Sequence, residues 1–380
     1  MRKSLSLLLM TLLSFSSFAV ATVGARSAQA KADIAVILPD SQSSVRWESF
    51  DRVYLDAAFK AAGVTYSIVN AQGDKQAMIT DEEAAITNGA KVLLFTDLDT
   101  ASGATVIAEA RKGGAKVIDY DRLTTEGPGA DFYVSFDGFA VGVAQGNGLV
   151  AAIKAAGLVH PVVAELNGSP TDNNAKLFAS GYDSILDPLY KDGTFIKGDN
   201  QSVPDWDNTK AETIFEQMLT AAKGKIDAAV AANDGLAIAV NSALANQGLK
   251  PIPVTGQDAT VGGIQQILEG KQSMTVYKAV KAQANAAAAL AIALLKGTDT
   301  KALATQTVDQ TVGGKNAAGN KALPAVILPV TSVTKDNIGS TVIADGFLKW
   351  ADICVGDAAP FCPPEASATM AATMAATAAN

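Results

Sequence analysis

The stretch KVIDYDRLTTEGPGADFYVSFD, residues 116–137, decides the fold prediction, because its two short apolar runs each end in charged residues. Asp121 and Arg122 follow the first run, and Asp137 follows the second. Two such runs, separated by a loop that contains Gly and Pro, predict two strands with charged carboxyl ends. In open α/β sheets, ligands bind just outside these strand ends. A carboxylate beside a guanidinium there can hold a polar molecule by charge-assisted hydrogen bonds, although a surface ion pair would give the same pattern.

The alternation of strand and helix continues on both sides of this stretch. Apolar runs at 31–38 (KADIAVIL) and 91–96 (KVLLFT) alternate with segments in which apolar residues recur at helical spacing. One strand and one helix together take about 25–30 residues, which is typical of parallel, doubly wound sheets. Because the pattern restarts after Asp137, we predict an α/β fold of two doubly wound parallel-sheet lobes.

Length and composition agree with a soluble protein of two domains. The chain has 380 residues, and a chain of this length commonly forms about two domains. Hydrophobic residues make up 48% of the chain and charged residues only 18%, which suits sheets covered on both faces. The net charge is −8 and no run of Lys and Arg is present, so we expect no nucleic-acid partner.

The first 30 residues have the pattern of a secretory signal peptide. Arg2 and Lys3 form a positive start, residues 5–20 form a short apolar region, and Ala-Gln-Ala at 28–30 is a small-residue cleavage site. A membrane anchor is the alternative, but serines interrupt the apolar region, which is short for a membrane span. We therefore predict cleavage after residue 30 and an extracytoplasmic or periplasmic location.

The C-terminal end contains both cysteines of the chain. Cys354 and Cys362 are eight positions apart. In an oxidising compartment they can close a small local loop, and two free thiols are the alternative. The residues that follow, 363–380, are a low-complexity mixture of Ala, Thr, Met and Pro, in which MAAT occurs twice. Such a composition lacks the bulk to form a core, so we expect disorder there.

Polar groups recur at the ends of further predicted strands. The additional clusters are Asp172-Asn173-Asn174, Asn233-Asp234, Gln257-Asp258 and Lys278. Any single Asp or Asn among them could instead be a helix N-cap. Taken together they converge on the carboxyl edges of two sheets. Carboxylates, amides and cations match hydroxyl groups that both donate and accept hydrogen bonds, so these clusters favour a neutral polyhydroxylated ligand.

Two tryptophans in polar loops complement these groups. Trp47 and Trp206 lie outside the apolar runs, and the C–H face of a pyranose can stack on an aromatic ring. Filling of the core is the alternative for either ring.

Enzymatic motifs are absent from the sequence. The chain has a single histidine, His160, which precedes a predicted strand and is interpreted as a loop residue. There is no HExxH, no GxSxG and no Cys/His spacing of a metal site. We therefore expect no catalytic residues, no metal and no cofactor.

Seven ordered segments resemble a known family. They are RWESFDR, YDRL, DFYVSFD, GSPTDNNAKLF, AANDGLA, TGQDA and MTVYKAV, and the similarity runs from Ala32 to about Trp350. The sequence resembles the periplasmic substrate-binding proteins of sugar ABC transporters, in the ribose/galactose-binding type I group, and within that group the members that bind D-xylose or several sugars. Residues 354–380 have no counterpart in that family, and the loop SQSSV at 41–45 differs from it in its polar residues.

The resemblance implies two lobes that close on a ligand. Residues 31–136 plus 259–278 would form the N-terminal lobe, and residues 137–258 plus 279–350 the C-terminal lobe, with 351–380 as a tail. Three hinge crossings are expected, near Asp137, near Gln257-Asp258 and near Lys278.

The resemblance also implies a function and a set of sugar contacts. It implies a monomeric, non-enzymatic receptor that captures a monosaccharide, D-xylose first, and delivers it to an ABC import permease. The alternative is a receptor for glucose, arabinose or galactose that docks on a chemoreceptor or sensor. Carried over motif by motif, the sugar contacts are Arg46, Trp47, Asp121, Arg122, Asp137, Asn174, Trp206, Asn233, Asp234, Asp258 and Lys278.

Overall fold

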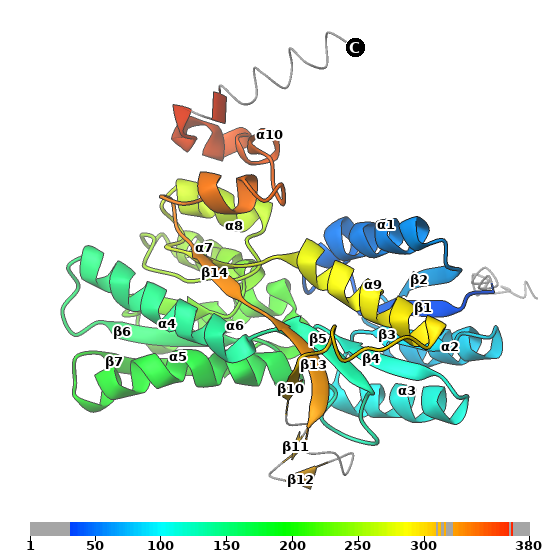
Figure 1. Cartoon of the computed structure of the whole chain (residues 1–380). Helices are drawn as coiled ribbons and strands as arrows, with labels where there is room; N and C mark the ends of the chain where they lie inside the picture. Colours follow the sequence, from blue (N-terminus) through cyan, green and yellow to red (C-terminus); the bar gives the residue numbers. More distant parts are fainter. Residues whose placement is uncertain (1–30, 309–310, 313–314, 317–321, 365, 368–380) are drawn as a thin grey trace, which may run out of the picture.

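Two lobes of strands and helices lie side by side in the computed structural model, with three chain crossings between them (Figure 1). The structure describes residues 31–308, 311–312, 315–316, 322–364 and 366–367. The predicted signal peptide, residues 1–30, lies outside the described residues. Among the described helices, none is long and apolar enough to cross a membrane.

The N-terminal lobe is built on a seven-stranded sheet with the order β10-β13-β5-β4-β3-β1-β2. Every neighbouring pair is parallel except β10 and β13, which are antiparallel. The strands are β1 (Ile34–Leu38), β2 (Tyr66–Asn70), β3 (Val92–Phe95), β4 (Lys116–Tyr120), β5 (Phe132–Phe136), β10 (Gln306–Val308) and β13 (Leu323–Leu328). A separate two-stranded sheet pairs β11 (Thr311–Val312) with β12 (Lys315–Asn316).

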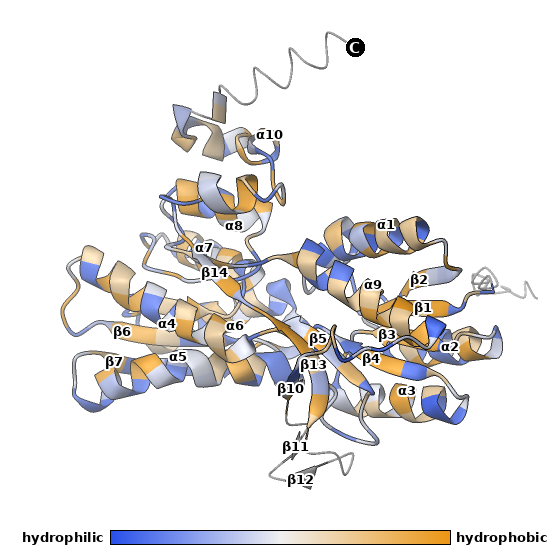
Figure 2. Ribbon diagram, viewed as in Figure 1, coloured by the Kyte–Doolittle hydropathy of each residue, from blue (hydrophilic) through white to orange (hydrophobic). Residues whose placement is uncertain are grey.

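Helices cover both faces of this sheet, which explains why its strands are almost continuously apolar. Alternate residues of β1 point to opposite faces: Ile34 packs toward α1 (Arg52–Ala62) and α9 (Val280–Lys296), and Ala35 toward α2 (Lys75–Thr87) and α3 (Thr100–Lys112). In Figure 2, β1 is largely orange, whereas α2 and α3 combine orange and blue. The helices therefore turn an apolar side to the sheet and a polar side to water.

The C-terminal lobe has a parallel core of β7-β6-β8, extended by single bridges to further strands. Bridges from Ala229 to Val254 and from Thr255 to Met274 connect this core to the antiparallel pair of β9 and β14. The segment just before Gln257, where the polar cluster predicted a strand end, is thus reduced to two bridging residues. The strands are β6 (Val162–Asn167), β7 (Ile196–Ser202), β8 (Ala228–Ala231), β9 (Thr275–Lys278) and β14 (Val330–Val333).

Helices also cover the C-terminal lobe, where α4 packs on α5, α6 on α7, and α8 on α7. The contact between α4 and α5 is close because glycines face each other: a Cβ on Gly142 would lie 2.0 Å from the carbonyl oxygen of Phe178. The helices are α4 (Gly138–Ala155), α5 (Asn173–Lys191), α6 (Asn208–Ala221), α7 (Asp234–Asn246) and α8 (Val261–Leu268). Short turns of helix are η1 (Trp47–Asp51), η2 (Pro204–Trp206), η3 (Gly339–Ile343), α10 (Trp350–Ile353) and η4 (Gly356–Phe361).

Two segments lie in the opposite lobe from the one predicted. α8 packs on α7 and β9 pairs with β14, so residues 259–278 belong to the C-terminal lobe. α9 packs against α1 and the seven-stranded sheet, which also contains β10 and β13. The assignment of 259–278 to the N-terminal lobe and of all of 279–350 to the C-terminal lobe is therefore wrong.

The crossings follow from this arrangement. The chain passes between the lobes at Asp137, after β5, and again just after Lys278, as predicted. The third crossing is at Pro329, between β13 and β14, and not near Gln257-Asp258. The first and third crossings are adjacent, since the backbone N–H of Asp137 donates to the carbonyl of Leu328 at 3.1 Å.

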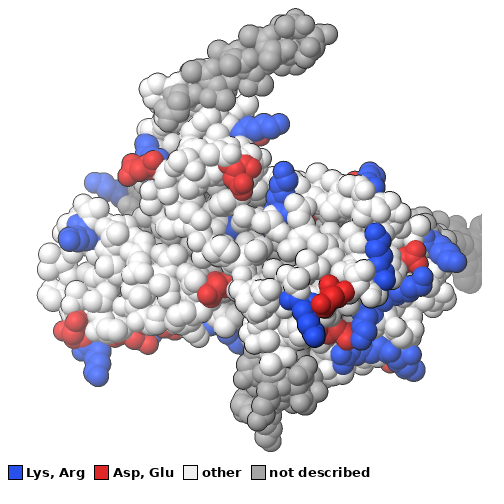
Figure 3. Space-filling model, viewed as in Figure 1, with Lys and Arg blue, Asp and Glu red and all other residues white. Residues whose placement is uncertain are grey.

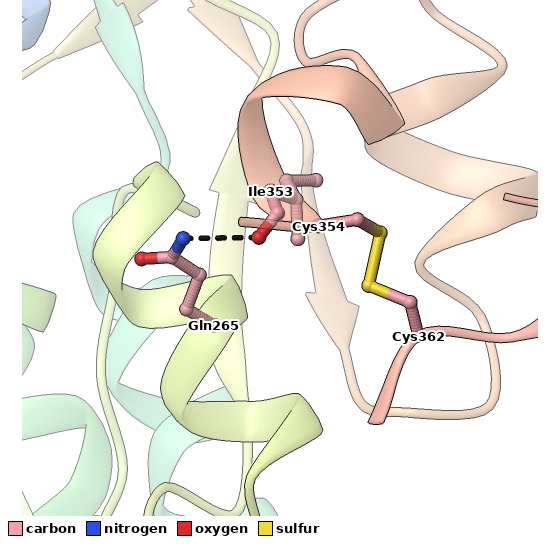
Figure 4. The surroundings of a disulfide bond; sticks show 4 residues. All are labelled: Gln265, Ile353, Cys354 and Cys362. Atoms are coloured by element: carbon pink, nitrogen blue, oxygen red, sulfur yellow. Dashed lines mark hydrogen bonds between the residues drawn. A yellow bond between two sulfur atoms is a disulfide. The ribbon is translucent and has the colours of Figure 1, made fainter. Parts of the chain in front are cut away.

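The C-terminal segment forms an ordered cap on α8. Cys354 and Cys362 form the predicted disulfide, and Gln265 of α8 donates to the carbonyl of Ile353 at 2.9 Å (Figure 4). Ala366 is buried in the same apolar cluster, so order extends beyond Pro363, where disorder was expected. Residues 368–380 lie outside the described part of the chain.

Charged side chains of both signs are interspersed on the face shown in Figure 3, mostly over the N-terminal lobe, and wide areas carry none. Several other acidic side chains are buried, among them one on α2. Glu82 on α2 is 1% exposed, and neither of its carboxylate oxygens has a hydrogen-bond partner among the described residues. Burial, together with the charges of Glu83 and Glu109, raises the pKa of Glu82 from 4.5 to about 7.

We expect Glu82 to lower stability as the pH rises. The folded state keeps the proton up to about pH 7, whereas the unfolded chain releases it near its ordinary pKa, so the free energy of unfolding falls between these values. The substitution Glu82→Gln should stabilise the protein at pH 8 by about 1–3 kcal/mol and have less effect at pH 4. Urea unfolding at both pH values measures this. Glu126→Gln, at an exposed glutamate in the loop between β4 and β5, is the matched control, and equal effects of the two substitutions would contradict the prediction.

Candidate functional site

A small polar cavity lies between the lobes, at the carboxyl ends of their strands, and we call it the inner cavity. Its volume is about 30 Å³, which is room for one or two waters. Both lobes and the hinge line it. The lining residues are Ser43, Ser44, Arg46, Trp47, Asp121, Arg122, Asp172, Asn174, Phe178, Trp206, Asn233, Gln257, Asp258 and Lys278.

The loop after β1 positions the first part of the wall. Asp40 ends the strand and folds the loop back, because its carboxylate accepts from the backbone N–H of Gln42 at 2.8 Å and from that of Ser43 at 2.6 Å. Ser43 in turn accepts from the indole N–H of Trp47 at 3.2 Å. Trp47 is thereby fixed at the start of η1, with the Arg46 guanidinium 4.5 Å from its ring centroid.

Arg46 is held rigidly although it is buried. Its Nη1 lies 2.8 Å from Asp121 Oδ2, and its Nε and Nη2 bond both oxygens of Asp51 at 2.9 and 2.8 Å. A further bond of 2.6 Å reaches Oε1 of Gln283 on α9. The two-pronged contact with Asp51 fixes the plane of the guanidinium, so Arg46 acts as a framework for Asp121.

Asp121 has an unusual backbone and a strongly ionised side chain. Its φ of 67° lies in the left-handed region, and hydroxyls of Tyr133 and Ser135 hold its carbonyl at 3.0 and 2.6 Å. Burial alone would raise the pKa of Asp121, but the charges of Arg46, Lys278 and Arg122 outweigh burial and lower it to about 2. Asp121 is therefore a permanent hydrogen-bond acceptor in the cavity wall.

The facing wall comes from the beginnings of helices in the C-terminal lobe. Asp172 and Asn233 are the N-caps of α5 and α7, so each side chain sits at the edge of the sheet. Trp206 donates from Nε1 to Asp172 Oδ2 at 3.0 Å. Its ring packs closely against Gly168, where a Cβ would lie 2.0 Å from an atom of the indole. Phe178 meets the same ring edge-on.

Hydrogen bonds and one ion pair connect the two walls directly. Arg122 Nε lies 3.1 Å from Asp172 Oδ2, and Asn174 Nδ2 donates to the carbonyl and Oδ1 of Asp121 at 3.1 and 3.2 Å. Two longer bonds join Asn233 to the carbonyl of Ser43 at 3.4 Å, and Ser44 to Asp258 at 3.3 Å. The lobes are therefore closed on each other.

The hinge contributes a cation to the same cavity. Lys278, the last residue of β9 before the second crossing, pairs with Asp258 Oδ1 at 3.0 Å, and both side chains are 7% exposed. Gln257 donates to the same oxygen at 2.8 Å. Any change in the angle between the lobes moves this pair relative to Asp121.

Comparison with known proteins identifies the family. The model of the periplasmic binding protein domain matches residues 34–299. The chain belongs to the periplasmic binding protein family. The resemblance found in the sequence is thus confirmed.

Named relatives in this family are binding proteins rather than enzymes. The D-xylose-binding periplasmic protein of Haemophilus influenzae is 37% identical over 303 residues, which cover 80% of this chain and 86% of that protein. The protein of the same name in Escherichia coli is 34% identical over 339 residues, covering 89% and 97%. A solved carbohydrate transporter solute-binding protein of Chloroflexus aurantiacus, in complex with D-glucose, has a TM-score of 0.73 at 31% identity, covering 84% and 98%.

Most of the eleven sugar contacts that the resemblance to the family implies line the inner cavity. The structure brings together nine of the eleven, which are Arg46, Trp47, Asp121, Arg122, Asn174, Trp206, Asn233, Asp258 and Lys278.

Two of the eleven, Asp137 and Asp234, lie outside the inner cavity. Asp137 is exposed, and its Oδ1 accepts from the backbone N–H of Ala140 at 2.9 Å, so it is the N-cap of α4. Asp234 is fully buried behind the cavity wall, where its carboxylate accepts from Thr260, Gln272 and Thr275 at 2.7–2.8 Å. Both are structural in this arrangement, and neither lines the cavity.

Five lining residues were not among the predicted contacts. Asp172 and Gln257 stand in the clusters that the sequence singled out, so those clusters could have pointed to them. Ser43 and Ser44 belong to the loop that differs from the family, and Phe178 resembles an ordinary helix residue. No local signal distinguishes Ser43 and Ser44, whereas Phe178 is the last residue of the family segment GSPTDNNAKLF.

His160 is exposed, as a loop residue would be, and its Nδ1 lies 2.7 Å from the carbonyl oxygen of Gly193, away from the cavity. Within the described part of the chain, no three His, Cys, Asp or Glu side chains gather in a way that could hold a metal ion.

Proposed function

We propose that this chain captures a monosaccharide in the inner cavity and delivers it to the membrane permease of an ABC importer. The observation that carries the proposal is the convergence of ionic, amide and aromatic side chains from both lobes on one small cavity. D-xylose is the first candidate, because relatives at 34 and 37% identity are named for binding it. Glucose, arabinose and galactose come next, and a solved relative contains D-glucose.

The side chains suit sugar hydroxyls, each of which donates one hydrogen bond and accepts others. Asp121, Asp172 and Asp258 can accept, whereas Arg122 and Lys278 can donate. Asn174 and Asn233 offer both an amide donor and a carbonyl acceptor. The rings of Trp47 and Trp206 provide apolar surface for the C–H face of the sugar.

Binding requires side chains of the two walls to replace their bonds to each other with bonds to the sugar. A volume of about 30 Å³ is smaller than a pyranose needs, because Asn174 and Arg122 now bond directly to Asp121 and Asp172 across the cleft. We infer that opening releases these cross-lobe bonds, that sugar hydroxyls take their place, and that closure then buries the sugar. Exclusion of water strengthens each new bond.

The energetic scale is adequate for tight binding. A neutral hydrogen bond contributes about 1 kcal/mol and a charged one about 1.5–3 kcal/mol, while sub-micromolar affinity needs about 8 kcal/mol. Several charged contacts and two stacking rings reach this range even after the cost of closure. A permease can contact only the outer surface of the protein. The closed arrangement of the two lobes is therefore the feature that it can recognise.

The remaining features of the proposal concern location and partners. A periplasmic location agrees with the names of the relatives. We propose that residues 1–30 are a cleaved signal peptide and that the mature protein is a monomer. Docking of the closed form on a chemoreceptor or sensor is a second use of the same shape.

The proposed function is tested by isothermal titration of refolded, ligand-free protein with D-xylose, D-glucose, L-arabinose, D-galactose and D-ribose. Refolding removes sugar that was carried through purification. We expect sub-micromolar binding of one or two of these sugars, with D-xylose among them. No heat with any sugar, from a sample with a cooperative unfolding transition, would contradict the proposal.

Substitution of Arg122 should weaken sugar binding at least tenfold. The guanidinium supplies donors to the cavity and pairs with Asp172, so Arg122→Ala removes a contact and leaves a buried carboxylate without its cation. Titration with the preferred sugar gives the affinity, and circular dichroism shows whether the variant is folded. Arg111→Ala, an exposed arginine on α3, is the matched control. Unchanged affinity in a folded Arg122→Ala protein would remove Arg122 from the site.

Substitution of Asp137 tests whether this residue is an N-cap, as in the structure, or a sugar contact, as the resemblance to the family implies. Because Asp137 is an exposed N-cap, Asp137→Ala should cost about 1 kcal/mol of stability and change the sugar affinity less than twofold. Asp121→Asn, which alters a lining residue, should weaken binding at least tenfold in the same assay. A tenfold loss of affinity in Asp137→Ala would return Asp137 to the binding site.

A further inference from the structure

A second cavity of about 240 Å³ adjoins the inner cavity at the rim of the cleft, and we call it the outer cavity. Its N-terminal-lobe wall includes Asp40, Gln42 and Gln72, and its C-terminal-lobe wall includes Ser169, Asp205 and Lys210. It is several times larger than the inner cavity, and it is likewise formed between the two lobes.

The two cavities share three lining residues, which are Ser43, Arg122 and Trp206. A molecule that fills the inner cavity and extends past these residues therefore enters the outer one. Arg122 forms part of this boundary. Its Nη1 and Nε are held at 2.9 Å by the carbonyl of Asp97 and at 3.1 Å by Asp172. Its Nη2 donates to Ser43 Oγ at 3.4 Å, a long bond that a sugar oxygen can replace.

The outer cavity is polar, but charged side chains that line it already have partners within the protein. Asp40 accepts from the loop backbone, Lys75 pairs with Asp99, and Lys210 lies 3.3 Å from Asp205 and 3.6 Å from Asp207. The other groups that line the outer cavity include amides and hydroxyls, together with the side chains of Leu98 and Trp206. This chemistry suits a neutral, hydroxyl-rich group better than an ion.

Among the described residues, no hydrogen bond or ion pair joins the N-terminal-lobe side of the outer cavity to its C-terminal-lobe side. The cross-lobe bonds all lie around the inner cavity, and within the described residues none joins Gln42 or Gln72 to Ser169, Asp205 or Lys210. The closed lobes therefore leave this space between them, and a ligand that fills it need not replace any hydrogen bond or ion pair between the lobes.

We propose that the cleft accepts a sugar that carries a second glycosyl unit, namely a short neutral disaccharide or glycoside. One ring occupies the inner cavity, the linkage passes Arg122, and the second ring lies in the outer cavity against Trp206. This inference rests on the proposed function, because it requires a sugar ring in the inner cavity.

The test is titration of the full chain, refolded without ligand, with D-xylose and with the β-1,4-linked disaccharide of xylose. We expect the disaccharide to bind within about tenfold of the affinity for xylose and to be displaced by excess xylose, since both occupy the inner cavity. Xylose binding without any disaccharide binding at millimolar concentration would overturn this inference and leave the proposed function standing. Absence of binding by every monosaccharide would contradict the proposed function and this inference with it.

A blocking variant locates the second ring. Gln42 is exposed, and its side chain makes no hydrogen bond among the described residues, so Gln42→Trp should fold and fill the outer cavity. We expect the disaccharide affinity to fall at least tenfold while the xylose affinity changes less than threefold. Gln247→Trp, at the far end of α7 from the cleft, is the matched control and should leave both affinities unchanged. Equal disaccharide affinities in wild-type and Gln42→Trp proteins would place the second ring elsewhere and overturn the proposal.

Discussion

An ionised carboxylate held in a buried cleft is the constraint on which the rest of the site depends. Asp121 is about 4% exposed, yet neighbouring cations keep its pKa at about 2. Those cations come from three parts of the molecule: Arg46 from the loop after β1, Arg122 from the next position in the chain, and Lys278 from the hinge. Removing any one of them leaves a buried charge less well compensated, which is costly. The lobes, the hinge and α9 are therefore all positioned around one side chain.

The same constraint connects the fold to the proposed mechanism. Asn174 from the opposite lobe completes the shell around Asp121, and this bond forms only when the lobes are closed. A sugar hydroxyl can replace that amide, so ligand binding and closure act on the same acceptor. Because α9 reaches Arg46 and Asp121 through Gln283, the segment that returns across the hinge also supports the site. A change in hinge angle would thus alter the positions of Arg46 and Asp121 in the cavity.

Much of the fold could be predicted from the sequence, because buried strands are short apolar runs and their ends are marked by polar residues. β1, β4 and β5 lie where these runs predict them. Local pattern does not say which sheet a segment joins, however, and this explains the misplaced segments at 259–278 and in α9. No cluster of charged or polar residues marks the third crossing, at Pro329, in the sequence. An Asp at a strand end can cap a helix, line a cavity or do both, as Asp137 and Asp172 show. Burial and partners distinguish these cases, and both depend on the tertiary fold.

We infer that a sugar replaces the cross-lobe partners of Asp121, and a crystal structure of the complex with D-xylose would show whether it does. We expect the sugar ring between Trp47 and Trp206, a sugar hydroxyl within hydrogen-bond distance of Asp121, and Asn174 bonded to the sugar instead of to that carboxylate. A sugar bound outside the inner cavity, or an unbroken bond between Asn174 and Asp121 in the complex, would contradict it.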